Sequence, residues 1–426
     1  MTTKMKDSKI EWVGEIPENW EVSKLKNLFS TEGGNGFNIE LQGEENGDYP
    51  FCKASDISVA QKDLKKAQNY VTKQIAILNR YNIIPQGSII FAKIGEAMKK
   101  NNRAICQCDC CIDNNCQALI PSSKIYTIFA YYILRCINMQ WFDNAGTIPC
   151  ISVRKMMNCT IPLPSFSEQK EIAEYLDEKC GEIDALLADI KDEIETLEQY
   201  KRSVITESVT KGLNPSAPMK NSGIEWVGEI PEHWEVKRIA AFYRLRNNKV
   251  SDKDFAALSV TKQGVLPQLE TVAKTDDGDN RKLVRIGDFV INSRSDRRGS
   301  CGISNYDGSV SLINIVLEPR SVASNKYYNW LFHTEQFADE FYKWGNGIVD
   351  DLWTTRWQNM KRITIPVPPL SEQQEIAEYL DKKCAEIDEV ISDKQTEIQT
   401  LESYKKSLIY EYVTGKKEVK SDVSGD

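Results

Sequence analysis

Two stretches of the chain carry apolar residues at alternating spacings of four and three. Such a heptad pattern keeps one stripe of a helix facing a partner, so it predicts a coiled coil. A single amphipathic helix lying on its own domain is the alternative interpretation. The expected seam residues are Leu176, Cys180, Ile183, Leu187, Ile190, Ile194 and Leu197 in the first stretch, and Leu380, Cys384, Ile387, Ile391, Ile398 and Leu401 in the second, which Lys394 interrupts once.

Both stretches carry signals of helix ends. Prolines precede Ser167 and Ser371 and disfavour helix before them. Serine is a favoured N-cap, so we expect the helices to begin at these two residues. Acidic residues in the first turn and lysine or arginine near the end complement the helix dipole.

Shorter apolar runs predict the remaining elements. Residues 88–94 and 288–292 predict buried strands, and residues 125–138 and 326–341 predict helices. Each globular region is therefore expected to mix α and β structure, which places the chain in the α+β class.

The chain contains two copies of one sequence unit. Residues 10–22 (IEWVGEIPENWEV) return as residues 224–236 with twelve of thirteen positions identical, and residues 167–184 return as 371–388 with fifteen of eighteen identical. This period is too long for a solenoid or propeller, so a whole domain with its helix is duplicated. The intervening loops differ, which favours related but different targets for the two halves.

The duplication divides the chain into six expected parts. Two near-identical helices in one chain are natural partners, and a pseudo-two-fold axis would pair them antiparallel. About 43 residues per helix would span roughly 65 Å, so the pair would act as a ruler. The parts are a first domain at 1–166, a long helix at 167–210, a linker at 211–223, a second domain at 224–370, a long helix at 371–414 and a disordered tail at 415–426.

Charge separates the helices from the rest of the chain. Residues 168–210 carry a net −8 and residues 372–414 a net −6, whereas the whole chain carries −8, which leaves +6 on the remainder. The globular parts are therefore basic, and the acidic balance of the whole chain does not exclude nucleic acid as a partner.

A basic loop follows each predicted buried strand. Arginine forks suit guanine edges and phosphates, and small polar groups suit the DNA backbone. One basic loop alone is usually solvated surface, but loops at matching positions of two domains favour DNA binding. The candidate DNA contacts are Lys93, Lys99, Lys100, Arg103, Arg281, Arg285, Asn292, Arg294, Arg297 and Arg298.

Cysteines and tryptophans suggest further binding sites, but a packing role is favoured for both. The cluster Cys106, Cys108, Cys110, Cys111 and Cys116 lacks the repeated pair spacing of zinc sites and has no counterpart in the second half, so packed thiols are favoured over zinc. Four tryptophans could stack on nucleic-acid bases, although packing within the protein is favoured for them. Four others belong to the duplicated frame and are expected to pack against the helix ends. These two sets are Trp330, Trp344, Trp353 and Trp357, and Trp12, Trp20, Trp226 and Trp234.

No motif of catalysis is visible. The chain has two histidines and lacks the H-E-x-x-H, phosphate-loop and G-x-S-x-G patterns and the Asn-Pro-Pro-aromatic motif of amino-methyltransferases, so we expect no enzyme activity and no metal. No apolar run approaches the ~18–20 residues of a membrane span, the start has no apolar core for a secretory signal, and twelve cysteines fit reduced thiols, so we expect a cytoplasmic protein without a membrane partner.

These residues together resemble the specificity subunit of type I restriction–modification enzymes over nearly the whole chain. The resemblance is carried by W-x-G-x-I-P-x-x-W at 12–20 and 226–234, by Gly-Asp-Phe-Val at 287–290, and by a proline followed by Glu-Gln-x-x-Ile ending at Ile172 and Ile376. The first copy departs from the pattern with Gly87-Ser88 in place of Gly-Asp, and its cysteine-rich loop is unusual.

The resemblance implies two target-recognition domains, each reading one half of a split, asymmetric site in double-stranded DNA. It also implies two modification subunits that carry S-adenosylmethionine and methylate adenine, and restriction subunits that use ATP and Mg²⁺. None of this chemistry would reside in the present chain, which would bind no cofactor. A coiled-coil adaptor that binds proteins, a stand-alone DNA-binding protein and a nucleic-acid enzyme acting alone stay open as alternatives.

Overall fold

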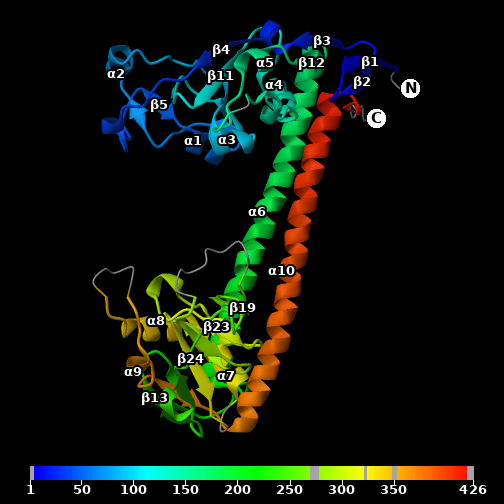
Figure 1. Ribbon diagram of the computed structural model, residues 1–426. Coiled ribbons are helices and arrows are strands. Elements are labelled where there is room, and N and C mark those ends of the chain that lie inside the picture. The colour runs from blue at the N-terminus through cyan, green and yellow to red at the C-terminus, as the bar shows by residue number, and fades with distance from the viewer. Residues whose placement is uncertain (1–3, 145, 269–277, 321–323, 348–352, 420–426) are drawn as a thin grey trace, which may run out of the picture. The chain divides into compact units, whose positions relative to one another are not determined.

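The computed structural model describes residues 4–144, 146–268, 278–320, 324–347 and 353–419 (Figure 1). The chain divides into two compact units, one combining residues 1–189 with 396–426 and the other comprising residues 190–395. Each unit holds one mixed α/β domain and part of each long helix. The predicted α+β class with two long helices is confirmed. Of the predicted tail, residues 420–426 lie outside the described residues.

The first unit is built around a five-stranded sheet. Its order is β4 (Phe29–Gly33), β11 (Cys116–Pro121), β8 (Ile89–Ala92), β9 (Arg103–Cys106) and β6 (Asp63–Leu64), and only the β6–β9 pair is parallel. Smaller sheets are β10 (Cys111–Ile112) with β5 (Tyr49–Cys52) and β7 (Tyr70–Val71), β1 (Met5–Ile10) with β2 (Gly14–Pro17), and β12 (Thr160–Leu163) with β3 (Glu21–Lys24). The short helices are α1 (Ala54–Val59), α2 (Lys73–Leu78), α3 (Gly95–Lys99), α4 (Thr127–Arg135) and α5 (Val153–Met157).

The second unit repeats this frame. Its main sheet has the order β16 (Tyr243–Arg246), β24 (Asn314–Pro319), β21 (Phe289–Asn292) and β22 (Cys301–Ile303), all antiparallel. Around it lie β17 (Lys249–Val250) with β20 (Arg281–Val284) and β23 (Gly308–Val310), β18 (Leu258–Thr261) with β19 (Gly264–Pro267), β13 (Met219–Ile224) with β14 (Gly228–Pro231), and β15 (Glu235–Arg238) with β25 (Thr364–Val367). The helices are α7 (Asn325–Phe332), α8 (Glu335–Lys343) and α9 (Trp357–Met360).

The predicted buried strands are β8 and β21, the central strands of the two main sheets. All four residues of each strand are buried, because both faces of each sheet are covered. The helix predicted at 125–138 is α4. The helix predicted at 326–341 is two helices, since Thr334 caps a new one by accepting a hydrogen bond from the backbone N–H of Phe337.

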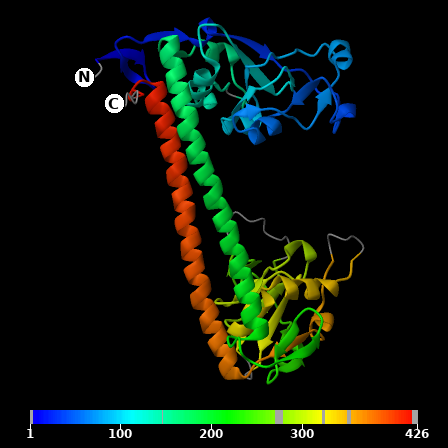
Figure 2. The same cartoon turned by 180° about the vertical axis from the view of Figure 1, so that it is seen from behind.

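The two long helices, α6 (Phe166–Lys211) and α10 (Leu370–Val413), pack against each other in both units. In the first unit Lys405 pairs with Asp184 at 2.5 Å, and the rings of Tyr175 and Tyr412 lie 4.5 Å apart. In the second unit Lys201 pairs with Asp388 at 2.6 Å, and Lys394 pairs with Glu193. In each unit, residues later in α6 contact residues earlier in α10. The helices are therefore antiparallel, as Figure 2 also shows.

Burial follows the heptad positions. Lys394, which interrupts the second series, reaches the acidic side chain of Glu193 and so remains compatible with pairing. Leu176, Cys180, Ile183, Leu187, Ile190, Leu380, Cys384, Ile387 and Ile391 are buried, and Ile194, Leu197, Ile398 and Leu401 are half-buried.

The helices begin slightly earlier than the sequence predicts. In α6 the hydroxyl of Ser165 accepts a hydrogen bond from the N–H of Glu168, whose carboxylate accepts one from the N–H of Ser165. This reciprocal capping box makes Ser165 the cap, so the prediction of Ser167 is wrong. In α10 the prediction of Ser371 is also wrong, because the helix begins at Leu370 and the carbonyl of Pro369 accepts from the first helical turn.

The two duplicated sequence blocks meet at a joint in each unit. The indole N–H of Trp20 donates to Glu168 at 3.2 Å, and that of Trp234 donates to Glu372 at 2.9 Å. These tryptophans pack against the helix ends, as the sequence predicts. The motifs therefore recur together because one anchors the other.

A buried glutamine completes each joint. Gln373 is 2% exposed; its side-chain oxygen accepts from the N–H of Ser324, and its amide donates to the carbonyl of Pro368. Gln169 holds Tyr126 and Pro164 in the same way. The joint thereby fixes the start of each long helix to the domain before it.

Replacing Gln373 by leucine is expected to destabilise the second unit by about 2–3 kcal/mol, because a backbone N–H and a carbonyl lose their buried partner. Chemical denaturation followed by circular dichroism measures this loss. The exposed neighbour Gln374, replaced by leucine, is the matched control. Equal stability of the two variants would contradict the role of Gln373 in fixing the start of α10.

Candidate nucleic-acid interface

The arginine loop of the second unit starts where β21 ends. Its backbone is tied to the segment before α9, since Ser293 accepts from the N–H of Thr355 and the N–H of Ser295 donates to Trp353, both at 2.9 Å. Arg294 forms a β-bridge with Thr354 between these contacts. The loop is therefore a fixed platform for its side chains.

Three arginine side chains extend from this platform. Those of Arg294, Arg297 and Arg298 are 36%, 67% and 47% exposed. Asp296 pairs with Arg294 at 3.1 Å and with Arg297 at 3.7 Å, and Arg298 pairs with an aspartate of α8. Surface ion pairs of this kind contribute little free energy, so a phosphate or a guanine edge can replace the carboxylate.

The first unit builds the same platform with lysines. After β8, Lys93 accepts a backbone hydrogen bond from Ile151 at 3.0 Å, and Ile94 bridges to Cys150. The side chain of Lys93 is half-buried and donates to Gln117 at 3.3 Å. Lys99 and Lys100 are exposed at the end of α3, where Lys99 pairs with Glu96. The two platforms match in backbone and differ in side chains.

Two of the candidate contacts lie inside the protein. Arg103 is 2% exposed and donates to the backbone carbonyls of Asn101 and Ile137, at 2.9 and 2.6 Å. Burial lowers the pKa of Arg103 to about 9, which leaves it protonated at neutral pH. Arg281 is 5% exposed and donates to Ser309 at 2.8 and 2.9 Å. Because side chains bound in this way hold the fold, we leave both out of the candidate surface.

The remaining candidates differ in exposure. Asn292 is buried, and its side-chain oxygen accepts from the N–H of Arg294, so it shapes the platform. Arg285 is exposed and pairs with Asp307 at 2.9 Å. The candidate surface of the second unit thus comprises Arg285, Arg294, Arg297 and Arg298, and that of the first unit comprises Lys93, Lys99 and Lys100.

Replacing Arg103 by leucine is expected to lower the free energy of unfolding by about 2–3 kcal/mol, since the carbonyls of Asn101 and Ile137 lose their donor. The salt dependence of DNA binding should stay unchanged, because the side chain does not reach solvent. Thermal denaturation and binding titrations over a salt series measure the two effects. A shallower salt slope would place Arg103 at the DNA instead.

The structure also explains Asp288 of the Gly-Asp-Phe-Val phrase, to which the sequence assigns no role. Its carboxylate is buried and accepts from Arg246 at 2.7 and 3.1 Å and from the N–H of Arg285 at 2.8 Å. In the first unit Ser88 occupies this position and donates to the carbonyl of Pro85. Where the first copy departs from this motif, a serine hydroxyl bonded to a backbone carbonyl therefore replaces the buried carboxylate bonded to an arginine.

Four of the five cysteines of the cluster are buried in the first unit, and Cys108 is half-buried. Cys106 and Cys110 are buried with their sulfurs 3.4 Å apart, Cys116 is buried in the same core cluster, and Cys111 is buried in a second one. Burial raises the pKa of Cys111 and of Cys116 to about 12, which keeps both thiols neutral. Within the described residues, no group of three or more histidine, cysteine or acidic side chains is placed to hold a metal ion.

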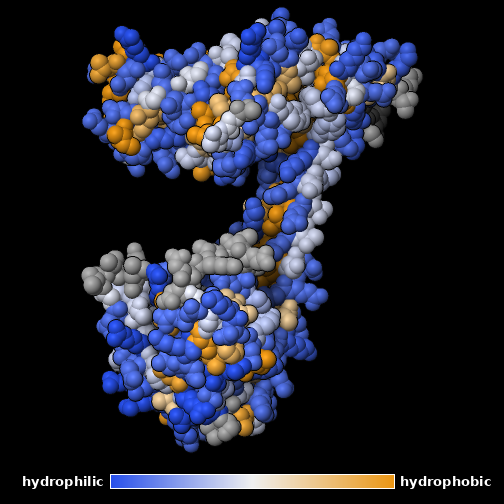
Figure 3. Space-filling view, viewed as in Figure 1, coloured by the Kyte–Doolittle hydropathy of each residue, from blue (hydrophilic) through white to orange (hydrophobic). Residues whose placement is uncertain are grey.

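The predicted tryptophan roles divide in the structure. Trp357 and Trp330 pack against the core of the second unit. Trp344 is 40% exposed and donates to Glu340 at 2.8 Å. The face of each unit that Figure 3 shows is mostly hydrophilic with scattered apolar residues. Across the described parts of the chain, no helix has the apolar length that crossing a membrane requires.

Comparison with known proteins identifies the family. The model of the type I restriction modification DNA specificity domain matches the chain twice, at residues 17–196 and 231–400. The chain is 26% identical over 96% of its length to the putative MjaX specificity subunit of Methanocaldococcus jannaschii, of which 96% is covered. It is 22% identical to the EcoR124I/EcoR124II specificity subunit of Escherichia coli over 53% of this chain and 48% of that one.

Solved structures share the fold. A chain from a study of complex assembly in a type I R-M system aligns with a TM-score of 0.67 at 14% identity, covering 93% of this chain and 98% of that one. The HsdS subunit of Thermoanaerobacter tengcongensis aligns with a TM-score of 0.51 at 15% identity, covering 94% and 98%. The resemblance found in the sequence is confirmed: the chain belongs to the family of type I restriction–modification DNA specificity subunits and carries the specificity domain in two copies.

Proposed function

We propose that the two domains read the two halves of a split, asymmetric DNA site. The observation that carries the proposal is the recurrence of one platform, after β8 and after β21, bridged in both units to the segment that precedes the final strand. A basic loop on a fixed backbone is suited to the major groove, where side chains reach base edges.

The difference between the platforms supports the asymmetry of the site. Arginine forks on the second platform suit bidentate contacts to the N7 and O6 atoms of guanine. Lysines on the first platform act as point charges with three donors and suit phosphates or single acceptors. Two unlike side-chain sets on one frame are expected to select unlike base sequences.

We further propose that the paired helices set the gap between the half-sites. A helix of 46 residues, the length of α6, extends about 69 Å at 1.5 Å per residue. Two half-sites on one face of B-DNA lie about 34–36 Å apart, which is within this length.

Partner subunits are proposed to supply the chemistry. Two modification subunits would bind S-adenosylmethionine and methylate adenine, and restriction subunits would use ATP and Mg²⁺. The exposed acidic residues of the long helices, among them Glu174, Glu182, Glu389 and Glu402, are the proposed docking surface for modification subunits. Replacing these four residues by lysine and measuring co-purification with the modification subunits tests the docking.

Sequencing of methylated bases in the host genome tests the whole proposal. A bipartite motif with two unlike halves and a fixed gap, absent after deletion of this gene, is the expected result. A contiguous motif would contradict the split site. Unchanged methylation after deletion would favour an adaptor, and tight binding of the site by the purified chain alone would favour a stand-alone DNA-binding protein.

A further inference from the structure

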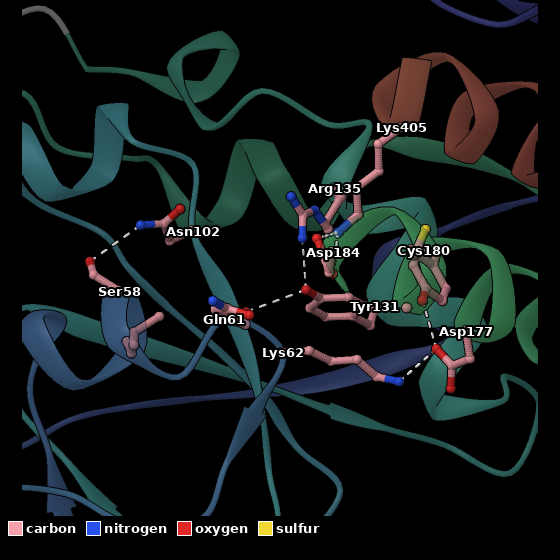
Figure 4. A pocket seen from close by; sticks show the side chains of 13 residues that line it. Ser58, Gln61, Lys62, Asn102, Tyr131, Arg135, Asp177, Cys180, Asp184 and Lys405 are labelled. Atoms are coloured by element: carbon pink, nitrogen blue, oxygen red, sulfur yellow. Dashed lines mark hydrogen bonds and ion pairs between the residues drawn. The ribbon is translucent and has the colours of Figure 1, made fainter. Parts of the chain in front are cut away.

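A surface cavity of about 490 Å³ in the first unit lies where several segments of the chain meet, among them α10, which supplies Lys405 (Figure 4). The turn after α1 supplies Lys62, α4 supplies Tyr132 and Arg135, and α6 supplies Asp177 and Asp184. The charged groups around the cavity are engaged with protein partners: Lys62 pairs with Asp177, Lys405 pairs with Asp184, and Arg135 donates to the hydroxyl of Tyr131. The lining therefore joins separate elements of the protein.

Asp177 contacts two of the elements that line this cavity. One of its oxygens accepts hydrogen bonds from the hydroxyl of Tyr132 and from the ammonium group of Lys62, each at 2.6 Å. Tyr132 is 3% exposed, and burial together with this hydrogen bond raises the pKa of its hydroxyl. A single carboxylate on α6 thus holds both α4 and the turn after α1.

The turn at Lys62 leads directly to the main sheet. The carbonyl of Lys62 accepts from the N–H of Ile105 in β9 at 2.7 Å, and β9 pairs with β8. The lysine platform begins where β8 ends, at Lys93. Contacts therefore run from Asp177 on α6 through Lys62, β9 and β8 to the candidate DNA contacts.

The second unit repeats the acceptor with other donors. Asp381, 204 positions after Asp177, accepts from the indole N–H of Trp330 at 3.0 Å and from Lys326 at 3.2 Å. Both donors lie on α7, four residues apart, so this carboxylate ties a single helix to α10. The side chain of Asp381 is also more exposed than that of Asp177, at 46% against 31%. The anchor of the first unit is the more extensive of the two.

We propose that Asp177 is a positioning residue for DNA recognition, which fixes the lysine platform relative to the long helix α6. This inference rests on the proposed split-site function. If the platform is fixed through Lys62, losing the ion pair lets the first domain turn on its helix. The complex then accepts gaps of other lengths and discriminates less well at the first half-site.

The test uses the full chain in complex with its modification subunits. Asp177→Asn keeps an oxygen for Tyr132 and removes the charge that holds Lys62, and Lys62→Met removes the other partner. Binding is measured on duplexes whose gap is one base pair shorter, native or longer, and on duplexes altered in one half-site. Each variant is expected to lose about tenfold in discrimination between gaps and at the first half-site only. The double variant should lose no more than either single one.

Three controls separate positioning from stability. Glu178→Gln changes an exposed carboxylate at the next position and should leave both readouts unchanged. Asp177→Glu keeps the charge and should restore part of the discrimination. Asp381→Asn should act on the other half-site, with a smaller effect.

Two outcomes would overturn the proposal. Asp177→Asn could discriminate gaps and half-sites as the unchanged protein does, or it could weaken binding equally at both half-sites and all gaps together with a lower melting temperature. Failure of the unchanged complex to recognise any split site would instead contradict the proposed function itself.

Discussion

Replacing Arg294 and Arg297 together by alanine is expected to weaken binding of the half-site read by the second domain about 100-fold or more. Each good bidentate contact contributes about 1–3 kcal/mol of discrimination, and two are removed. The backbone of the loop is held by Thr355 and Trp353, so truncation of the side chains should leave its conformation intact. Competition binding with duplexes altered in one half-site measures the loss.

A matched variant and a salt series complete this experiment. Arg244→Ala removes an exposed arginine of the same unit, which lies on β16 and pairs with Glu318, and should leave recognition unchanged. If the two loop arginines contact phosphates instead of bases, the slope of log K against log salt should fall by about one for each, with specificity retained. Equal loss at both half-sites would contradict the assignment of this loop to one half.

The sequence predicts the long helices and their seam well, because burial along a helix is periodic. Leu176 and Leu380 are among the most buried residues and stand at the start of each predicted series. The buried strands β8 and β21 follow from short apolar runs for a similar reason. Both signals are local, and they need no knowledge of what packs against the residue.

Individual site residues are harder to predict, since the decisive partner is distant in the sequence. Arg103 is buried because Ile137, 34 positions later, offers a carbonyl, and Arg281 because Ser309 offers its hydroxyl and its carbonyl. A window around either arginine shows only a basic residue near a strand. Asp288 is likewise missed, because its partner Arg246 lies 42 positions earlier.

The duplicated motifs show what recurrence can and cannot reveal. Recurrence marks Trp20 and Glu168 as parts of a frame, yet they are 148 positions apart, and only the structure shows that they bond. Recurrence of a residue does not mean that its partner recurs. The equivalent carboxylates of the two long helices accept from the hydroxyl of Tyr132 in one unit and from the indole of Trp330 in the other. Function on such a frame is therefore expected to reside in the residues that do not match, such as Arg294, which has Ile94 at the equivalent bridge of the first unit.

Lengthening both long helices by one heptad is expected to shift the preferred gap between the half-sites towards longer DNA. Seven residues keep the seam facing its partner and add about 10.5 Å, close to three base pairs at ~3.4 Å each. Duplicating residues 187–193 in α6 and 395–401 in α10 adds facing seam residues to both helices, because Glu193 and Lys394 mark where they pair.

The measurement is binding of the complex to duplexes with gaps from two base pairs shorter to four longer than native. Both half-sites should still be required, since neither platform is altered, and the optimum should move by up to about three base pairs. The helical twist of DNA opposes the full shift, because each added base pair rotates one half-site away from its domain. Duplication in α6 alone is the control: it breaks the register with α10 and should lower stability without defining a new optimum. An optimum that stays at the native gap in the doubly lengthened chain would mean that something other than the paired helices sets the spacing.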